Sequence, residues 1–387
     1  MSSTAPHIPI WETVVHSPEL LDAVKHVDAT KANEVSRLRQ RWTAEEVHVA
    51  LVLHRARSSA VGRLDNAQTI VADPTSVQQA TSTSVAKWKA KRFDQFADVV
   101  DLCCGIGVDL DALPLGAVGV EIDPLRCWMA SQNTGKHVCS EDARQYKFSS
   151  NSVIHVDPSR RDDNGRRLGL DEMQPNITEV QKICANSNGG CVKLSPAIDL
   201  DDVECIGQQR EIEYIEHRGR VVQGLVWFDS LANTDAEVSA TSLTTGTTLS
   251  GTGIAPPQSN RIGTWIYEPN PALERAKLHG TLAHALQLWE PALGLGLLCA
   301  DCQIESQWFT TFEVLETTTL RREKIAAALH DHNGGEVEVK TRSGVIDPDK
   351  WQKQLQKPAS ETNRRLTVFA IRLGERRVAL ITRRVVQ

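Results

Sequence analysis

The chain has 387 residues, more than one ordinary domain needs, and its length predicts two or three domains. The share of hydrophobic residues, 41%, suffices for a core, and no apolar run approaches the length of about 18 residues that a membrane span requires. The net charge of -6 argues against a wholesale nucleic-acid coat, although residues 310–387 carry 15 Lys and Arg against 10 Asp and Glu, a net charge of +5. Nine scattered cysteines and an N-terminus without an export signal favour a reducing, cytoplasmic location.

Residues 1–95 are predicted to form a helical region. A helix is expected in SPELLDAVKHV after a Ser17 cap, and a second in TAEEVHVALVLHRARSSAVGRL after a Thr43 cap. A third helical segment, TSTSVAKWKAKRF, leads into the first strand of the next region. We expect these helices to form a lid or a substrate-facing appendage.

Residues 96–264 alternate between strand and helix patterns, which predicts an α/β domain whose sheet is mainly parallel. A late antiparallel hairpin is expected within EIEYIEHRGRVVQGLVWF. The segment 236–264, rich in Thr, Ser and Gly, is expected to be an exposed hairpin and a linker. The earlier strands are predicted in ADVVDL, GAVGVEI, KHVCS, SVIHVD and GGCVKLS.

Residues 265–387 are predicted to form a small α+β domain. Helices are expected in YEPNPALERAKLHGTLAHALQLWEPA and LRREKIAAALHDHNGG, and strands in QWFTTFEVLET and EVEVKTR. The final segment, RRLTVFAIRLGERRVALITRRV, is expected to be a hairpin with a Gly-Glu turn.

The stretch DLCCGIGVDL, residues 101–110, follows a buried strand pattern and contains a tight glycine turn. A dinucleotide fold needs G-x-G-x-x-G, and Leu110 stands where the third glycine belongs, which disfavours a nicotinamide oxidoreductase. The remaining D-x-x-x-G-x-G pattern resembles the first motif of class I S-adenosylmethionine-dependent methyltransferases. That resemblance implies that Asp101 lies near the methionine amino group and that Cys103 replaces a glycine usual in the family. It implies cofactor contacts at Asp101, Cys103, Gly105, Gly107 and Asp109.

Acids stand at the carboxyl ends of the next two predicted strands. Glu121 can accept hydrogen bonds from both ribose hydroxyls, and Ile122 follows it. Asp142 matches the family's acid that contacts the adenine amino group, and Ala143 would supply a backbone amide to the ring. Because the carboxyl ends of parallel strands share one edge, these residues are expected to line one crevice. Loop acids or helix caps are the alternative interpretation.

The stretch Asp157-Pro158-Ser159-Arg160-Arg161 ends the fourth predicted strand, where such enzymes bind the methyl acceptor. No aromatic residue follows Pro158, so a stacked exocyclic amine is not supported. Covalent pyrimidine chemistry is disfavoured too, because the stretch after the fifth strand, residues 193–196, reads KLSP without a cysteine nucleophile. We predict that Asp157 orients the acceptor or takes its proton, with Pro158 beside it. Arg160 would grip a phosphate or carboxylate, or else belongs to a solvated basic loop.

Taken together, these motifs resemble the bacterial methyltransferases that carry a C-terminal THUMP-like domain. The resemblance extends to HRARSSAVGRL and QATSTSVAKWKAKRF before the turn, and to WIYEPNPALERA and EVKTRSGVIDPDKW after it. It implies a Rossmann-like fold, S-adenosyl-L-methionine as cofactor and, by analogy with true THUMP domains, a tRNA or rRNA substrate. The Arg-rich final hairpin fits phosphate binding or an exposed sheet face equally well.

Two other functions remain open from the sequence. One is a methyltransferase of a small molecule or protein; the other is a non-catalytic RNA-binding module on a vestigial methyltransferase fold. A metal site is not expected, because Cys299-x-x-Cys302 has no second ligand pair nearby.

Overall fold

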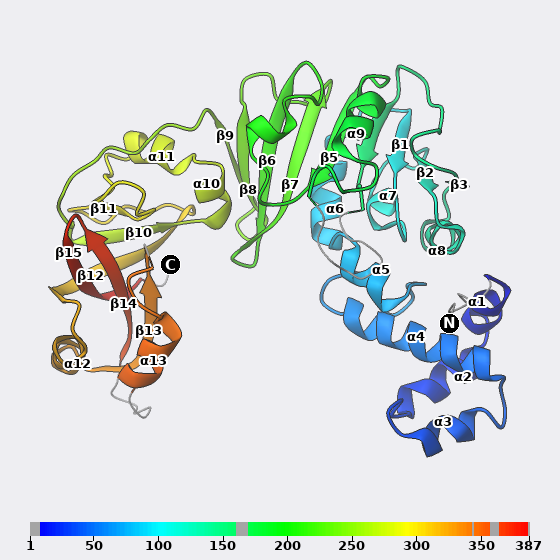
Figure 1. Cartoon of the computed structure of the whole chain (residues 1–387), viewed down its shortest axis with the longest axis horizontal. Coiled ribbons are helices and arrows are strands. Elements are labelled where there is room, and N and C mark those ends of the chain that lie inside the picture. The colour runs from blue at the N-terminus through cyan, green and yellow to red at the C-terminus, as the bar shows by residue number, and fades with distance from the viewer. Residues whose placement is uncertain (1–7, 160–168, 343, 357–363, 386–387) are drawn as a thin grey trace. The chain divides into compact units, whose positions relative to one another are not determined.

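The computed structural model describes residues 8–159, 169–342, 344–356 and 364–385 (Figure 1). The chain divides into two compact units. The first comprises Met1–Glu211 and Leu225–Thr234, and the second comprises Ile212–Gly224 and Asp235–Gln387. The three-domain division with boundaries near residues 96 and 265 stays a prediction.

A nine-stranded sheet has the strand order β3-β2-β1-β4-β5-β7-β6-β8-β9. Strand β1 runs parallel to both β2 and β4, and the order along the sheet reverses direction at β1. In such a sheet, ligands bind outside the carboxyl ends of the strands at the point of reversal. The predicted parallel α/β sheet is thereby confirmed. Its first five strands are β1 (Val99–Leu102), β2 (Val118–Glu121), β3 (Val138–Ser140), β4 (Val153–Val156) and β5 (Gly189–Leu194).

The late hairpin consists of β6 (Arg210–His217) and β7 (Arg220–Asp229), as the sequence predicted. Only Arg218 and Gly219 connect them, and both have positive φ, 54° and 77°. Two consecutive residues with positive φ are typical of the tight turn that matches strand twist.

The hairpin expected within 236–264 is present as β8 (Val238–Ser242) and β9 (Thr247–Gly251), but its predicted exposure is wrong for β8. All five residues of β8 are buried, and the strand pairs in parallel with β6. Its hydroxyls have buried partners: Thr241 donates to Glu213, and Ser242 donates to Glu216 at 2.5 Å. Satisfied hydroxyls allow a polar sequence to lie inside a sheet.

In the described part of the chain, seven helical segments precede β1. Thr43 caps α4 with a reciprocal capping box to Glu46, as predicted, whereas Ser17 makes no side-chain cap for α2. The segments are α1 (Ile8–Val15), α2 (Pro18–Ala23), the 3₁₀ turn η1 (Val24–His26), α3 (Ala32–Leu38), α4 (Ala44–Ala60), α5 (Pro74–Gln79) and α6 (Thr83–Ala90). Those between the strands of the first unit are α7 (Val108–Ala112), α8 (Pro124–Thr134), α9 (Ile177–Cys184) and η2 (Leu200–Val203).

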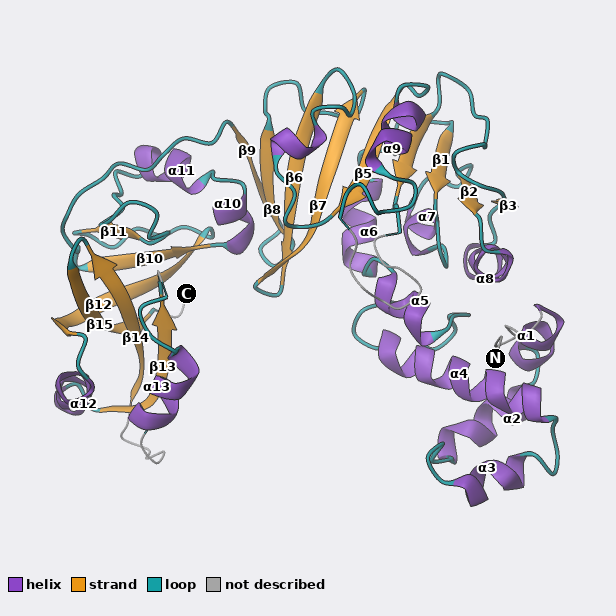
Figure 2. Ribbon diagram, in the orientation of Figure 1, coloured by secondary structure: helices purple, strands orange, loops and turns teal. Residues whose placement is uncertain are grey.

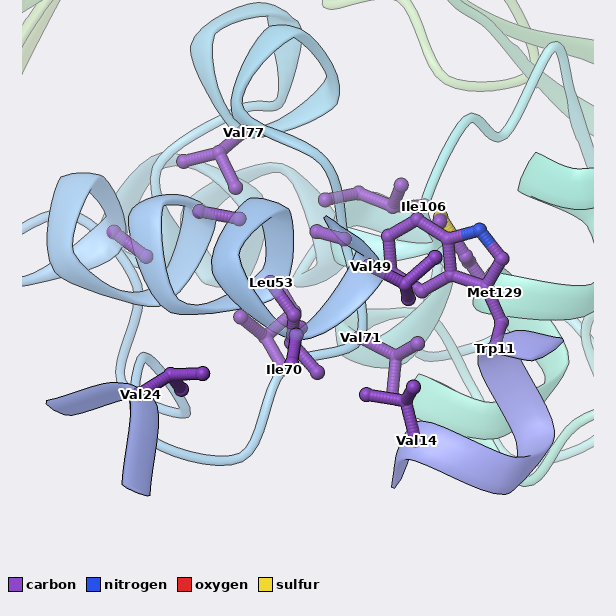
Figure 3. Packing of buried hydrophobic residues seen from close by; sticks show 14 of the residues in the cluster. Trp11, Val14, Val24, Val49, Leu53, Ile70, Val71, Val77, Ile106 and Met129 are labelled. Atoms are coloured by element: carbon purple, nitrogen blue, oxygen red, sulfur yellow. The ribbon is translucent and has the colours of Figure 1, made fainter. Parts of the chain in front are cut away.

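One hydrophobic core joins these N-terminal helices to the glycine turn (Figure 3). Trp11, Val14 and Leu53 belong to the same buried cluster as Ile106 of the turn and Met129 of α8. The position of the turn therefore depends on packing contributed by residues far upstream.

The second unit contains a six-stranded sheet in the order β11-β10-β12-β15-β14-β13, and it confirms the predicted α+β class (Figure 2). The helix expected from Tyr267 begins later, because residues up to Pro269 form β10 between β11 and β12. The strands are β10 (Trp265–Pro269), β11 (Leu298–Ala300), β12 (Phe309–Thr319), β13 (Gly334–Thr341), β14 (Arg364–Leu373) and β15 (Arg376–Arg384). The helices are α10 (Pro271–Arg275), α11 (His279–Ala285), α12 (Arg322–Asp331) and α13 (Pro348–Leu355).

Among the described residues, no helix combines the length and apolar character that crossing a membrane requires.

Candidate functional site

The turn between β1 and α7 has the geometry of a ligand cradle. Cys103, Gly105 and Gly107 all have positive φ, at 62°, 59° and 84°. A Cβ at Gly107 would lie 2.8 Å from Thr134 Cγ2 and 3.2 Å from Ala130, so only glycine fits there. At Gly105 a Cβ would meet no heavy atom within 4 Å, which leaves open space beside the backbone.

Glu121 ends β2 and fastens the turn. Its Oε2 accepts a hydrogen bond from the Gly105 N–H at 2.9 Å, and its Oε1 accepts from Asp123 N–H at 3.0 Å. Burial raises the pKa of this carboxyl, although the two backbone bonds oppose the shift. Each carboxylate oxygen keeps a second lone pair that can accept from a hydroxyl. Ile122, next to it, is 62% exposed.

Asp101 is fully buried at the end of β1, in register with His155 of β4. Its Oδ1 lies 2.7 Å from His155 Nδ1, while its Oδ2 has no hydrogen-bond partner among the described residues. Burial raises the pKa of Asp101, with the opposing effect of His155 too small to cancel it. A buried carboxylate oxygen without a partner is rare and points to a bound donor.

Asp109 lies in the first turn of α7, where it binds residues from upstream of β1. The Lys89 ammonium is 2.7 Å from Asp109 Oδ1, and Thr81 Oγ1 donates to Oδ2 at 2.6 Å. Burial alone would raise the pKa of Asp109, but the Lys89 ammonium holds it below its ordinary value. Asp109 therefore anchors α6 and its preceding turn to the site.

Asp142 follows β3 and is held by Arg144, whose Nε is 2.9 Å from both carboxylate oxygens. Hydrogen bonds from Arg144 keep the pKa of Asp142 below its ordinary value. Arg144 also reaches Glu179 of α9 at 3.2 Å. Ala143 and Arg144 line a hollow of about 560 Å³ next to Asp142, bordered by Tyr146 and Lys182. Asp101, Gly105 and Glu121 do not line this hollow.

At the predicted acceptor residues, Asp157 Oδ2 is 2.6 Å from the ammonium of Lys193, which lies near the end of β5. Lys193 is 5% exposed and Asp157 is 24% exposed, so the pair lies at the boundary between core and surface. Pro158 is buried directly after it. Arg160 lies outside the described residues.

Cys103 and Cys104 are poor nucleophiles in this setting. Burial and nearby carboxylates raise the pKa of both thiols well above the ordinary value, so neither is a thiolate at neutral pH. Within the described part of the chain, no group of three or more His, Cys, Asp or Glu residues is arranged to hold a metal ion.

Three residues that the sequence does not single out for the site are brought there by the fold. His155 reads in the sequence as a capping or packing residue, Lys89 has no evident role, and Lys193 is only the first residue of KLSP. Aligning the predicted strands by their ends places His155 beside Asp101, because both are the third residue of their strand. Nothing in the linear sequence directs Lys89 toward Asp109.

This chain is similar to known proteins both in its C-terminal region and over most of its length. Residues 309–384 match the family described as THUMP domain-like. Proteins of two Mycobacterium tuberculosis strains, CDC 1551 and H37Rv, are 29% identical over 319 residues, which cover 79% of this chain and 86% of each relative. Both are described as uncharacterized S-adenosylmethionine-dependent methyltransferases. A solved structure from Porphyromonas gingivalis W83, described as a methyltransferase, matches with a TM-score of 0.74 and 17% identity, covering 97% of this chain and 99% of that one.

The chain is a methyltransferase with a C-terminal THUMP-like domain. The predicted Rossmann-like methyltransferase fold and the predicted C-terminal THUMP-like domain are thereby confirmed. The donor-side residues of this methyltransferase fit an adenosine ligand that bears a cationic amino-acid end. Oδ2 of Asp101 is buried and has no hydrogen-bond partner in the part of the chain that the structure describes, which suits a cation, and the open space at Gly105 leaves room beside the turn. The individual site residues stay predictions.

Proposed function

We propose that this S-adenosylmethionine-dependent methyltransferase modifies RNA, with tRNA or rRNA as substrate. The observation that carries the proposal is the THUMP-like domain at residues 309–384 together with its basic surface. Seven arginines of β14 and β15 are exposed, and the region from residue 310 onward has a net charge of +5. Lys and Arg contacts to phosphates supply most of the sequence-independent affinity for nucleic acid. The arginines are Arg364, Arg365, Arg372, Arg376, Arg377, Arg383 and Arg384.

The donor-side residues would hold S-adenosylmethionine by its charged and polar groups. Asp101 would accept from the α-ammonium, and Glu121 from the ribose hydroxyls, while the turn at Gly105 and Gly107 keeps the backbone close. Asp142 would accept from the adenine amino group, for which it must share lone pairs now bonded to Arg144. The cofactor supplies an activated methyl group on its sulfonium.

The acceptor-side residues would position the nucleophile. Lys193 fixes the carboxylate of Asp157 by the 2.6 Å ion pair, and Asp157 can then orient an O–H or N–H group of the RNA. Orientation of this kind is the main contribution such an enzyme can make, because the donor is already reactive. We propose that Arg160 holds an adjacent phosphate.

We place the reaction in the cytoplasm. All nine cysteines are free thiols, as expected of a protein from a reducing compartment.

The test is a methyl-transfer assay with labelled S-adenosylmethionine and total RNA from cells that lack this protein. Label is expected in one modified nucleoside after digestion and mass spectrometry, and not with a Glu121→Ala variant. The same incubation with the protein and small-molecule fractions of those cells serves as the comparison. Label confined to either of those fractions, or transfer to no fraction at all, would contradict the RNA assignment.

A further inference from the structure

A chain of buried contacts runs from α6 to the donor side of the site. The Lys89 ammonium lies 2.7 Å from Asp109 Oδ1 and 2.9 Å from His155 Nε2. His155 Nδ1 in turn lies 2.7 Å from Asp101 Oδ1. The side chains of Lys89, His155 and Asp101 are 2%, 1% and 0% exposed, so water does not compete for these bonds.

The hydrogen-bond donors and acceptors of Lys89, His155 and Asp101 can be arranged in only one way. An ammonium group only donates, so Nε2 of His155 must be the accepting nitrogen. The imidazole proton is then on Nδ1 and is donated to Asp101 Oδ1. His155 is neutral in this arrangement, and one oxygen of Asp101 is committed to it.

Among the ion pairs of the described residues, none joins Asp101 to a Lys or Arg side chain. Asp109 neutralises Lys89, and His155 carries no charge, so the cluster has a net charge of -1 located on Asp101. Its second oxygen, Oδ2, is buried without a partner among the described residues. An unpaired buried charge is unfavourable, and an incoming cation removes that penalty.

We propose that Lys89 and His155 are positioning residues that fix the Asp101 carboxylate for the α-ammonium of the methyl donor. This inference rests on the proposed function, since it assumes the S-adenosylmethionine site. It extends that site to Lys89, a residue of the helical region upstream of β1, which contacts no ligand itself. Because these contacts fix the carboxylate that faces the α-ammonium, they should affect the affinity only for ligands that carry the amino-acid end.

The test compares two ligands by calorimetry. S-adenosylhomocysteine carries the amino-acid end, and 5′-methylthioadenosine lacks it while keeping the ribose and adenine. Lys89→Met is expected to weaken S-adenosylhomocysteine binding about tenfold or more and to change 5′-methylthioadenosine binding less than about twofold. Lys87→Met is the matched control, because Lys87 lies on the same helix, is 64% exposed and pairs only with Asp65 at the surface among the ion pairs described. This control is expected to change neither affinity.

A double-mutant cycle tests whether Lys89 acts through Asp101. In an Asp101→Asn background, Lys89→Met is expected to weaken S-adenosylhomocysteine binding less than about twofold further. Equal losses for both ligands would show a merely structural role, and an unchanged S-adenosylhomocysteine affinity in folded Lys89→Met would also overturn the inference.

A second pair of variants covers the case in which Lys89→Met does not fold. His155→Asn keeps an N–H donor beside Asp101, and His155→Leu removes it, so only His155→Leu is expected to lose the preference for S-adenosylhomocysteine. The reverse order overturns the inference. Wild-type protein that binds no S-adenosylhomocysteine overturns the donor site and this inference together, whereas wild-type protein that binds it but methylates no RNA overturns the acceptor assignment alone.

Discussion

Cys103 occupies a backbone conformation that glycine adopts more easily. Its φ of 62° is left-handed, which costs a residue with a Cβ about 1–2 kcal/mol. We expect Cys103→Gly to leave the free energy of unfolding unchanged or raise it by up to about 1 kcal/mol, because strain relief is partly offset by the flexibility of the unfolded chain. Cys103→Val should lower it by about 1–2 kcal/mol, since β-branched residues avoid this conformation. Urea titration of the three proteins measures the order, and a more stable valine variant would contradict the argument.

Asp101 should make donor binding sensitive to acid. Burial raises the pKa of its carboxyl above the ordinary value, and only the ionised form attracts an ammonium group. S-adenosylhomocysteine affinity should therefore fall as pH decreases, at pH values where exposed aspartates are still ionised. The effect on folding has the opposite sign: between the unfolded and folded pKa values of Asp101 the folded protein binds more protons, so this group's contribution to stability falls as pH rises.

Calorimetry across a pH series measures the affinity for S-adenosylhomocysteine. The same series with 5′-methylthioadenosine measures the contribution of Glu121 to the pH dependence. The pKa of Glu121 is also raised by burial, but that residue faces the ribose in our proposal and affects both ligands. Asp101→Asn should bind S-adenosylhomocysteine weakly. The pH dependence of its S-adenosylhomocysteine affinity should then equal that of its 5′-methylthioadenosine affinity, because the contribution of Asp101 is gone. An unchanged pH profile in this variant would rule out Asp101 as the titrating group.

At the scale of elements, helix α8 connects the upstream segment to the glycine turn through Asn133. Its Oδ1 accepts from the Val71 N–H at 2.8 Å, and its Nδ2 donates to the carbonyls of Val71 and Ile106 at 3.0 and 2.9 Å. Asn133→Ala leaves these backbone groups without their partner and should lower the free energy of unfolding by about 2–3 kcal/mol. Thermal or urea unfolding checks this. Gln132→Ala, at an exposed position of the same helix, should stay within about 0.5 kcal/mol of wild type.

Apolar strands were predictable because their composition leaves few alternatives, and β1, β2, β4 and β5 lie where their patterns indicate. The buried strand β8 was not, because its sequence, VSATS, looks exposed until Glu213 and Glu216 are placed opposite its hydroxyls. The late start of α10 has a similar cause: pairing with β11 and β12 extends a segment that reads locally as helix. Contacts with residues distant in the sequence determine both the burial of β8 and the late start of α10.

In the candidate site, too, some residues could be predicted from the sequence and others could not. Asp101, Glu121 and Asp142 were predictable because an acid at or near the carboxyl end of a parallel strand lies at a known edge of the sheet. Lys89, His155 and Lys193 were not, since their roles depend on which side chains face one another across α6, β4 and β5. The register between β1 and β4 could have indicated that His155 lies beside Asp101. The direction of the Lys89 side chain depends on how its helix packs.

For the whole molecule, charge is divided unequally along the chain. Residues 310–387 have a net charge of +5, and the chain as a whole has -6, so the remainder is strongly acidic. An acidic body repels phosphate, so the RNA substrate that we propose would contact the THUMP-like domain in preference to the rest of the chain. Affinity for RNA should therefore depend on a few arginines and decline steeply with salt.

Replacing Arg376 and Arg377 by serine tests this division, because both are exposed at the start of β15. The slope of log Kd against log salt for bulk tRNA should become shallower by about 0.7–0.9 for each arginine that binds a phosphate in the wild-type complex. Affinity for S-adenosylhomocysteine should not change, since the donor site that we propose lies at β1 and β2. Arg37→Ser with Arg39→Ser removes the same charge from exposed positions near α3 and should leave the slope nearly unchanged. If both double variants shift the slope equally, RNA responds to net charge alone, and the THUMP-like domain is not its preferred contact surface.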